Sequence, residues 1–406
     1  MSIGLEQERQ AEESTHVRIA VVGTGFAGLG MAIRLKQDGI DDFVVLERAQ
    51  DVGGTWRDNT YPGCACDVPS HLYSFSFAPN PDWTRTFSSQ PEIWGYLRGC
   101  AERFGVTPHI RYGHELLHAT WDGEAQRWSV ETSRGALTAD VLVLGTGPLS
   151  EPAIPDVPGL DSFRGTTFHS ARWDHDHDLS GERVAVIGTG ASAIQFVPQI
   201  QPQVARLHLF QRTPAWVVPR PDRPVKPWAR RLFRRLPVAQ ALVRAFIYWL
   251  RELSVLFFKH PKLMGMNEGL GRRHLERSVT DPELRARLTP SYRMGCKRIL
   301  ISDDYYPAVS QPNVEVVTEH ISEVRPTRSS PPVGSSARST PSSSAPVSTS
   351  PTSPSPTGSR GTRGWCSPTC GGAAPRPTWA RRSPAIPTCS CWWGPTRGWA
   401  TRLSCS

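Results

Sequence analysis

Residues 17–28 read Val-Arg-Ile-Ala-Val-Val-Gly-Thr-Gly-Phe-Ala-Gly, and this stretch decides the fold. Its apolar, β-branched first half predicts a buried parallel strand. Gly23, Gly25 and Gly28 then follow in G-x-G-x-x-G spacing, and residues 29–36 predict a helix. In this context the first glycine makes a tight turn, the second lets the backbone approach a pyrophosphate, and the third lets helix and strand pack closely. The stretch therefore predicts a Rossmann-type dinucleotide-binding unit.

A second strand is predicted at residues 43–46, and Glu47 follows it 19 residues after Gly28. A carboxylate at that place can accept hydrogen bonds from the ribose diol of a dinucleotide. The sequence continues Gly53-Gly54-Thr55-Trp56. A glycine pair soon after the acidic strand end is typical of FAD sites, with a simple loop as the alternative. We expect FAD in this unit, with Gly54, Thr55 and Trp56 among its contacts.

A second unit of the same kind follows. The apolar run 141–144 and its small-residue turn predict the strand that leaves the first unit, and the proline-rich run 152–158 predicts a stiff linker. Residues 183–187 predict another buried strand, followed by Gly188-Thr189-Gly190-Ala191-Ser192-Ala193 and a helix through residue 200. Ala193 replaces the third glycine and still permits fairly close packing. We expect Gly188, Gly190, Ser192 and Ala193 to bind the second dinucleotide.

The strand predicted at residues 206–210 ends in Gln211-Arg212-Thr213-Pro214, without an acidic residue. A cation there favours the 2′-phosphate of NADPH over the free diol of NADH. We expect Arg212 and Thr213 to bind NADPH, with an ordinary exposed arginine as the alternative for Arg212. The chain is therefore predicted to be an α/β protein with two Rossmann-like domains. These are an FAD domain at 1–150 and an NADPH domain at 151–326, the latter with a helical insertion at about 227–289.

Between the two units the sequence reads Phe163-Arg164-Gly165-Thr166-Thr167-Phe168-His169-Ser170-Ala171-Arg172-Trp173-Asp174. This resembles the F-x-G-x-x-x-H-x-x-x-W-[P/D] fingerprint of the type I Baeyer–Villiger monooxygenases of the flavin-containing monooxygenase superfamily. Phe163, Gly165, His169, Trp173 and Asp174 are its matching positions. The related N-oxygenating flavin monooxygenases generally carry another aromatic residue where Trp173 stands. The resemblance covers about residues 16–326, and members that act on cyclohexanone or 4-hydroxyacetophenone look nearest.

Two further segments resemble the family. Tyr61-Pro62-Gly63-Cys64-Ala65-Cys66-Asp67-Val68-Pro69-Ser70 is similar to the segment that brings an aspartate beside the flavin, and Gly295-Cys296-Lys297-Arg298 to the segment with the active-site arginine. The resemblance implies that NADPH reduces FAD and that a C4a-peroxyflavin inserts one oxygen atom of O2 into a ketone. Arg298 would stabilise the peroxide anion, with Asp67 orienting it. An ordinary Arg298–Asp67 ion pair is the alternative.

In the resemblance, His169 and Trp173 link cofactor binding to domain motion. Two other functions stay open. One is N- or S-oxygenation, with an amine or thioether as substrate in place of the ketone. The other is an inactive, truncated remnant of such an enzyme.

The formal net charge of +9 is no sign of a nucleic-acid partner. Residues 327–406 hold nine arginines and no Asp, Glu or Lys, so they account for the whole excess and leave residues 1–326 formally neutral. The scattered cysteines before residue 327 suit a reduced, cytoplasmic protein without a secretory signal. Those after it lack C-x-x-C spacing, so no metal site is expected. Charged residues interrupt the apolar stretch 241–258, which argues against a transmembrane segment and for a buried or partner-facing helix, with membrane association as the alternative.

Composition changes abruptly after Pro326, where Pro, Ser, Thr, Arg and Gly begin to dominate. Such a tail normally indicates low-complexity disorder. A codon argument favours another origin. If each true codon joins the third base of one printed codon to the first two bases of the next, residues 391–401 can encode Leu-Val-Gly-Pro-Asn-x-Gly-Leu-Gly-His, which resembles the family's C-terminal flavin-site segment. Ser339 to Thr352 can likewise encode its second crossover strand. We therefore expect residues 327–406 to be out of frame, with a natural disordered tail as the alternative.

Overall fold

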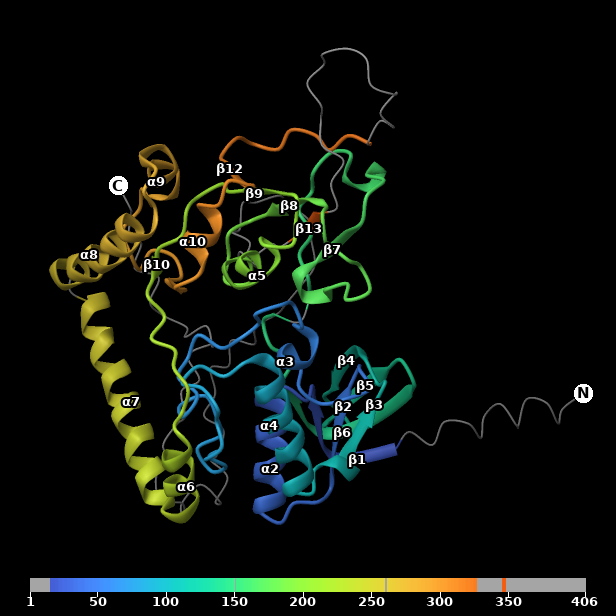
Figure 1. Ribbon diagram of the computed structural model, residues 1–406. Coiled ribbons are helices and arrows are strands. Elements are labelled where there is room, and N and C mark those ends of the chain that lie inside the picture. The colour runs from blue at the N-terminus through green and yellow to red at the C-terminus, as the bar shows by residue number, and fades with distance from the viewer. Residues whose placement is uncertain (1–14, 150, 260, 327–344, 348–406) are drawn as a thin grey trace, which may run out of the picture. The chain divides into compact units, whose positions relative to one another are not determined.

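Two large sheets organise the chain in the computed structural model, which describes residues 15–149, 151–259, 261–326 and 345–347 (Figure 1). The described residues all lie within one compact part of the chain. The expected out-of-frame or disordered tail lies outside the described residues, apart from 345–347. The α/β fold class predicted from the sequence is confirmed.

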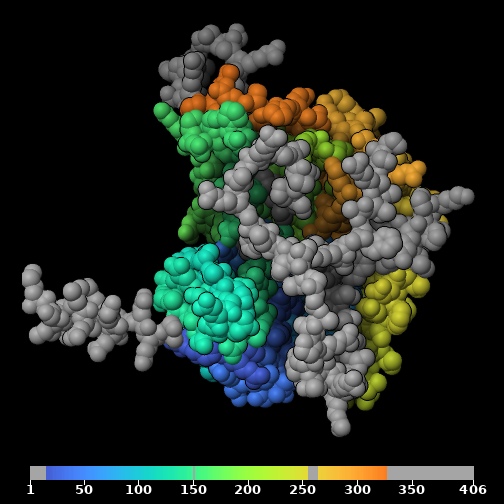
Figure 2. Space-filling view, turned by 180° about the vertical axis from the view of Figure 1, so that it is seen from behind, coloured from blue at the N-terminus to red at the C-terminus, as the bar shows by residue number. Residues whose placement is uncertain are grey.

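The first sheet has the order β3-β2-β1-β6-β5-β4. Its strands are β1 (Thr15–Val22), β2 (Phe43–Glu47), β3 (Ile110–Tyr112), β4 (Leu116–Asp122), β5 (Arg127–Thr132) and β6 (Gly135–Leu144). β3, β2, β1 and β6 run parallel, whereas β6, β5 and β4 form an antiparallel extension. Every residue of β2 is buried, as expected for a parallel strand that is covered on both faces. Figure 2 shows the antiparallel part, coloured cyan, at the surface of the molecule.

Two helices lie side by side on one face of this sheet, α2 (Phe26–Gln37) and α4 (Gln90–Arg103) (Figure 1). They bury an apolar core that includes Leu29, Ile33 and Leu97. A smaller core on the opposite face joins β1 and β2 to the antiparallel strands. Short helical turns complete the unit: α3 (Thr55–Asp58) and the 3₁₀ helix η1 (Thr107–His109). The first glycine turn is thus held between two packed layers.

The second sheet is wholly parallel, in the order β12-β9-β8-β13-β7. Its strands are β7 (Thr167–His169), β8 (Arg183–Ile187), β9 (Arg206–Phe210), β12 (Val314–Val317) and β13 (Ala345–Val347). The helices α5 (Ala193–Ile200) and α10 (Tyr305–Val309) pack together beside it. β10 (Val217–Val218) and β11 (Leu300–Ile301) form a separate parallel pair, and η2 (Leu160–Ser162) and η3 (Ser170–Arg172) are 3₁₀ turns. β13 comes from the tail, within the range where the shifted frame predicts a crossover strand.

Four helices lie between residues 227 and 288, where the sequence predicts a helical insertion. They are α6 (Pro227–Arg235), α7 (Pro237–Lys259), α8 (Pro261–Ser278) and α9 (Pro282–Leu288). Each begins with proline, whose fixed φ and missing N–H suit the first position of a helix. The apolar stretch within α7 does not form a buried helix, because Leu242 and Phe246 are exposed. Among the described residues, no helix is both long and apolar enough to cross a membrane.

Three glycines from two distant stretches meet where β1, α2 and β6 join. A Cβ on Gly28 would lie 1.9 Å from the Gly23 carbonyl oxygen, and one on Gly23 would lie 2.8 Å from that of Gly145. A Cβ on Gly145 would lie 2.8 Å from the Gly28 nitrogen. Each glycine thus occupies space that the other two leave free. Gly23 also has a φ of +92°, which side chains rarely adopt.

Replacing Gly28 with alanine should therefore destabilise the fold. The added methyl must displace backbone rather than a flexible side chain, so we expect the Gly28→Ala variant to lose about 1–3 kcal/mol of stability. Gly95→Ala is the matched control, since a Cβ there meets nothing within 4 Å in the middle of α4. That variant should be unchanged or slightly more stable. Equal urea-unfolding midpoints for both variants would contradict the packing described here.

Candidate functional site

The first glycine turn is tied to Glu47 at the end of β2. One Glu47 carboxylate oxygen accepts hydrogen bonds from the Thr24 amide at 3.0 Å and the Thr24 hydroxyl at 2.6 Å. The other accepts from the Ala49 amide and the Arg57 guanidinium, both at 2.9 Å. Burial alone would raise the Glu47 pKa, but these hydrogen bonds and the Arg57 charge outweigh it and lower the pKa. Glu47 is therefore an ionised, buried anchor of the turn.

The turn is shaped to receive a phosphate group. Gly25 caps α2, and the first turn of this 12-residue helix offers backbone amides and a positive dipole end. The glycine pair at residues 53–54 folds back onto the turn, so that a Cβ on Gly54 would lie 3.1 Å from the Gly25 Cα. A side chain at residue 54 would crowd this approach, and the φ of +51° at Gly54 also favours glycine there. The residues present thus fit a dinucleotide, although a ribose diol at Glu47 would have to share an oxygen that Arg57 already contacts.

Thr55 and Trp56 begin α3, immediately after this glycine pair. The indole nitrogen of Trp56 donates to the Tyr73 hydroxyl at 2.9 Å, and the Trp56 carbonyl accepts from the Gln90 side chain. The Trp56 ring packs against three separate groups of buried apolar residues. These contacts give Trp56 a clear structural role, which is to fix the loop that covers the first glycine turn.

Asp67 and Arg298 form an ion pair, although 231 positions separate them in the sequence. The side chains are 32% and 48% exposed, so both reach solvent while they stay in contact. Nearby thiols are poor nucleophiles, because burial raises the pKa of Cys64 to about 11 and of Cys66 to about 12. The 61–70 segment thus contributes Asp67 to an ion pair that solvent can reach.

Arg220 is a second cation here, and the sequence did not indicate it. Its guanidinium donates to the Cys66 carbonyl at 3.5 Å, and its carbon lies 5.5 Å from the centre of the Phe87 ring. The Arg220 Nε is buried without a hydrogen-bond partner. It stands in a loop between β10 and the helical insertion, outside any recognisable motif, so only folding brings it next to residue 66.

The second glycine turn follows the same design as the first. The Gly188 amide donates to the Phe210 carbonyl at 2.9 Å, which holds the turn to the end of β9, and Ala193 is fully buried at the start of α5. Gly190 and Ser192 stand in the loop between them, partly exposed. Ala193 thus takes the place of the third glycine, and its methyl group is packed without exposure to solvent.

At the end of β9, one residue is buried and the next is exposed. Gln211 is buried and donates to the Arg287 carbonyl at 2.9 Å. Arg212 is exposed and makes no hydrogen bond or ion pair with another described residue, and Thr213 follows it, partly exposed. Arg212 is therefore free to contact an anion at the strand end where the sequence predicts the 2′-phosphate of NADPH.

Gln195 links the two glycine-turn regions, and no motif predicted this. From the first turn of α5, its side-chain oxygen accepts from the Tyr61 hydroxyl at 3.0 Å and the Ala65 amide at 3.3 Å. Its side-chain nitrogen donates to the Ala65 carbonyl at 2.9 Å. Since Ala65 lies two residues before Asp67, α5 helps to position the segment that carries the ion pair.

The fingerprint residues lie around β7 and η3. Trp173 packs against Phe168 and against Phe196 of α5, with ring centres 5.1 and 5.2 Å apart. His169 caps η3 by accepting from the Ala171 amide, at 3.0 Å. Phe163, Gly165 and Asp174 are partly buried, and Asp174 accepts from the Asp176 amide. Through Trp173, the fingerprint segment is therefore fastened to α5.

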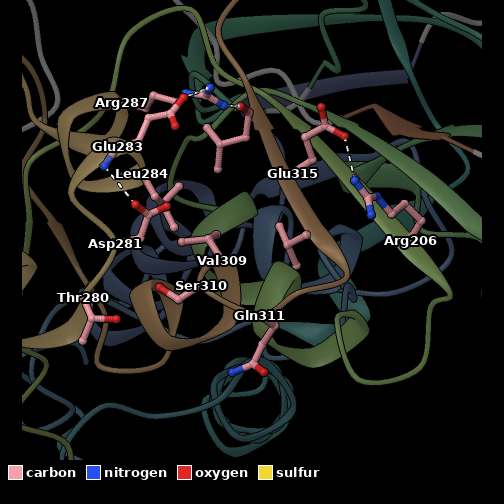
Figure 3. A pocket seen from close by; sticks show the side chains of 12 residues that line it. Arg206, Thr280, Asp281, Glu283, Leu284, Arg287, Val309, Ser310, Gln311 and Glu315 are labelled. Atoms are coloured by element: carbon pink, nitrogen blue, oxygen red, sulfur yellow. Dashed lines mark hydrogen bonds and ion pairs between the residues drawn. The ribbon is translucent and has the colours of Figure 1, made fainter.

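The cavity of 290 Å³ in Figure 3 lies elsewhere, beside α9, α10 and β12, and none of the predicted site residues lines it. Its charged groups already satisfy one another. Arg206 pairs with Glu315 at 3.0 Å, and Arg287 pairs with Glu283 at 2.6 Å. Since none of the residues that the sequence predicts for the site lines it, this cavity is not the candidate site. Among the described residues, no cluster of His, Cys, Asp and Glu is arranged to hold a metal ion.

Comparisons with known proteins agree with this geometry. Residues 20–246 match the family model of the pyridine nucleotide-disulphide oxidoreductases. A Baeyer–Villiger monooxygenase of Streptomyces coelicolor is 61% identical over 311 residues, which cover 76% of this chain and 60% of that protein. The chain thus spans about 60% of the length of the curated relatives it matches.

Solved structures give the same result. The structure of an oxidised steroid monooxygenase bound to NADP superposes with a TM-score of 0.66 at 33% identity, covering 75% of this chain and 65% of that one. The structure of OTEMO complexed with FAD and NADP superposes with a TM-score of 0.71 at 26% identity, covering 83% and 71%. The chain therefore belongs to the pyridine nucleotide-disulphide oxidoreductase family and, within it, is related to the Baeyer–Villiger monooxygenases.

Proposed function

We propose that the chain is an FAD- and NADPH-dependent monooxygenase that inserts one oxygen atom of O2 into a ketone, giving an ester or lactone. The observation that carries the proposal is the Asp67–Arg298 pair. Two segments that resemble the family independently meet at this pair, although they are far apart in the chain. The 61% identity to a Baeyer–Villiger monooxygenase and the two glycine turns support the same function.

The first turn would hold the FAD pyrophosphate, through Gly23, Gly25 and Gly28 and the amides at the start of α2. The second turn and Arg212 would hold NADPH. When bound, FAD would accept a hydride from NADPH and activate O2, which no side chain of the chain can do. The protein contributes binding, orientation and a fixed charge.

That fixed charge is Arg298. A guanidinium stays protonated in proteins and has five N–H donors, so its contact with Asp67 leaves donors for a further partner. Negative charge that develops on oxygen during the reaction is stabilised by a cation already in place. Asp67 acts as a positioning residue, because it holds the guanidinium in place and occupies only some of its N–H donors.

An inactive remnant is the second candidate, and β6 provides the observation in its favour. β5 pairs with β6 only as far as Ala139, so along residues 140–144 the described strands pair with one side of β6, that facing β1. Val141 and Leu144 are 45% and 62% exposed there. An apolar strand with an open edge normally pairs with another strand. Its partner would come from the part of the relatives' length that this chain does not match.

Flavin content separates the two candidates. An active enzyme should purify yellow, release FAD in about equimolar amount on denaturation, and oxidise NADPH faster when cyclohexanone is added. Product analysis with cyclohexanone, a tertiary amine and a thioether then separates ketone oxygenation from N- or S-oxygenation. A colourless protein that takes up no FAD would instead support the remnant. Sequencing the gene around Pro326 tests the frame independently.

Arg298→Met should remove oxygenation while it preserves the cofactor sites. We expect kcat for ester or lactone formation to fall about 10²–10³-fold, as for other fixed donors of a developing oxyanion. FAD content should be unchanged, and NADPH should still be oxidised with release of hydrogen peroxide. Arg127→Met, an exposed arginine of β5, is the matched control. Product formation by Arg298→Met at the control rate would rule out this role.

Arg212→Ala should weaken the preference for NADPH. Losing a charge-assisted hydrogen bond to the 2′-phosphate should raise KM for NADPH about tenfold or more, while KM for NADH stays nearly constant. The exposed Arg277 of α8, replaced by alanine, serves as the control. If Arg212→Ala changed both KM values equally, the arginine would not read the phosphate.

A further inference from the structure

Helix α7 exposes a continuous apolar ridge. The ridge consists of side chains that are 55–70% exposed and recur every three or four positions, so they share one face of the helix: Val238, Leu242, Phe246, Trp249 and Leu253. Ala241 and Ala245, also exposed, lie on the same face. Single exposed apolar side chains are common on protein surfaces, but this ridge joins several of them into one contiguous apolar surface.

The opposite face of α7 contacts the protein through polar groups. Gln240 is buried and donates to the Asn80 carbonyl at 2.6 Å. Arg244 donates to the carbonyls of His71 and Leu72, both at 3.0 Å. A helix packed only on its own protein normally turns its apolar face inward. α7 keeps Val243 and Ile247 partly buried on its inward side but leaves the larger apolar ridge outside, which indicates that another surface covers the ridge.

Charge indicates what covers it. From Arg223 to Arg251 the chain has eight basic residues and no acidic one. α6, which lies next to α7 (Figure 1), alternates exposed apolar and basic side chains on one face: Trp228, Arg231, Leu232 and Arg235. Tryptophan, phenylalanine and leucine beside arginine are the composition of helices that lie in the surface of a membrane.

We propose that α6 and α7 dock on an anionic lipid surface, with the ridge in the acyl boundary and the α6 arginines at the headgroups. α7 would lie along the surface and not cross it, in keeping with its interrupted hydropathy. A second copy fits less well, because two basic segments would face each other. Residues 327–406 also fit poorly as a cover, since they carry nine arginines and no acid. The proposal does not depend on the proposed enzymatic function.

Co-sedimentation of the full chain with vesicles tests the proposal. We expect binding to phosphatidylcholine vesicles that contain about 30% phosphatidylglycerol, and much weaker binding to phosphatidylcholine alone. Raising NaCl from about 0.1 to about 0.5 M should weaken the binding, because salt screens the arginines. Leu242→Gln/Phe246→Gln/Trp249→Gln should lower the partition coefficient more than about tenfold. Arg231→Gln/Arg235→Gln should lower it about tenfold and reduce its dependence on salt.

Leu117→Gln is the matched control, since Leu117 is an equally exposed leucine on β4, and it should bind like the unaltered chain. All variants should keep their circular dichroism spectra, because the replaced side chains are at the surface. The proposal is overturned if the unaltered chain stays in the supernatant with anionic vesicles, or if the ridge variant binds as well as the control.

Two further outcomes would assign the ridge to another occupant and equally overturn the proposal. A dimer in sedimentation velocity that the ridge variant converts to monomer would assign it to a second copy. A Leu242→Cys thiol that stays unreactive towards maleimide in the lipid-free protein, located by peptide mapping, would show that the chain itself covers the ridge.

Discussion

The close packing of Gly23, Gly28 and Gly145 is the constraint on which the rest of the structure depends. Each lacks a side chain where the backbone of another passes. This contact brings the start of α2 against the ends of β1 and β6, so that helix amides and the helix dipole face the same turn. Glu47 then fixes the turn through Thr24, with two hydrogen bonds. The surface that we propose for the FAD pyrophosphate is therefore open because residues 23, 28 and 145 carry no side chain.

The candidate site is made by linking this unit to the second one. Gln195 holds Ala65 by two hydrogen bonds, and Trp173 packs on Phe196 one residue further along α5. The fingerprint and the 61–70 segment are therefore fastened to the same short helix. Packing on α5 thus relates the fingerprint segment to the 61–70 segment, which carries Asp67.

Net charge proved a poor guide to local charge. Residues 1–326 are formally neutral, yet residues 223–251 carry only basic charges. The sequence alone favoured a buried or partner-facing helix for the apolar stretch within α7. The structure corrects the buried alternative, because Gln240 and Arg244 form hydrogen bonds on the inward side of α7 while Leu242, Phe246 and Trp249 stay exposed. Amphipathic spacing gives a helix two faces, but it does not say which face meets the protein.

The sequence by itself determined the two glycine turns and the strands and helices beside them, because these depend on local backbone sterics and on runs of apolar residues. It also placed Asp67 and Arg298 in one site, through resemblance. Only the tertiary structure decided that Glu47 is already bonded to Arg57, that Gln195 joins the two units, and that Arg220 lies beside Cys66. These contacts join residues that no local pattern relates, since hydrogen bonds between distant segments form only when packing has brought the segments together.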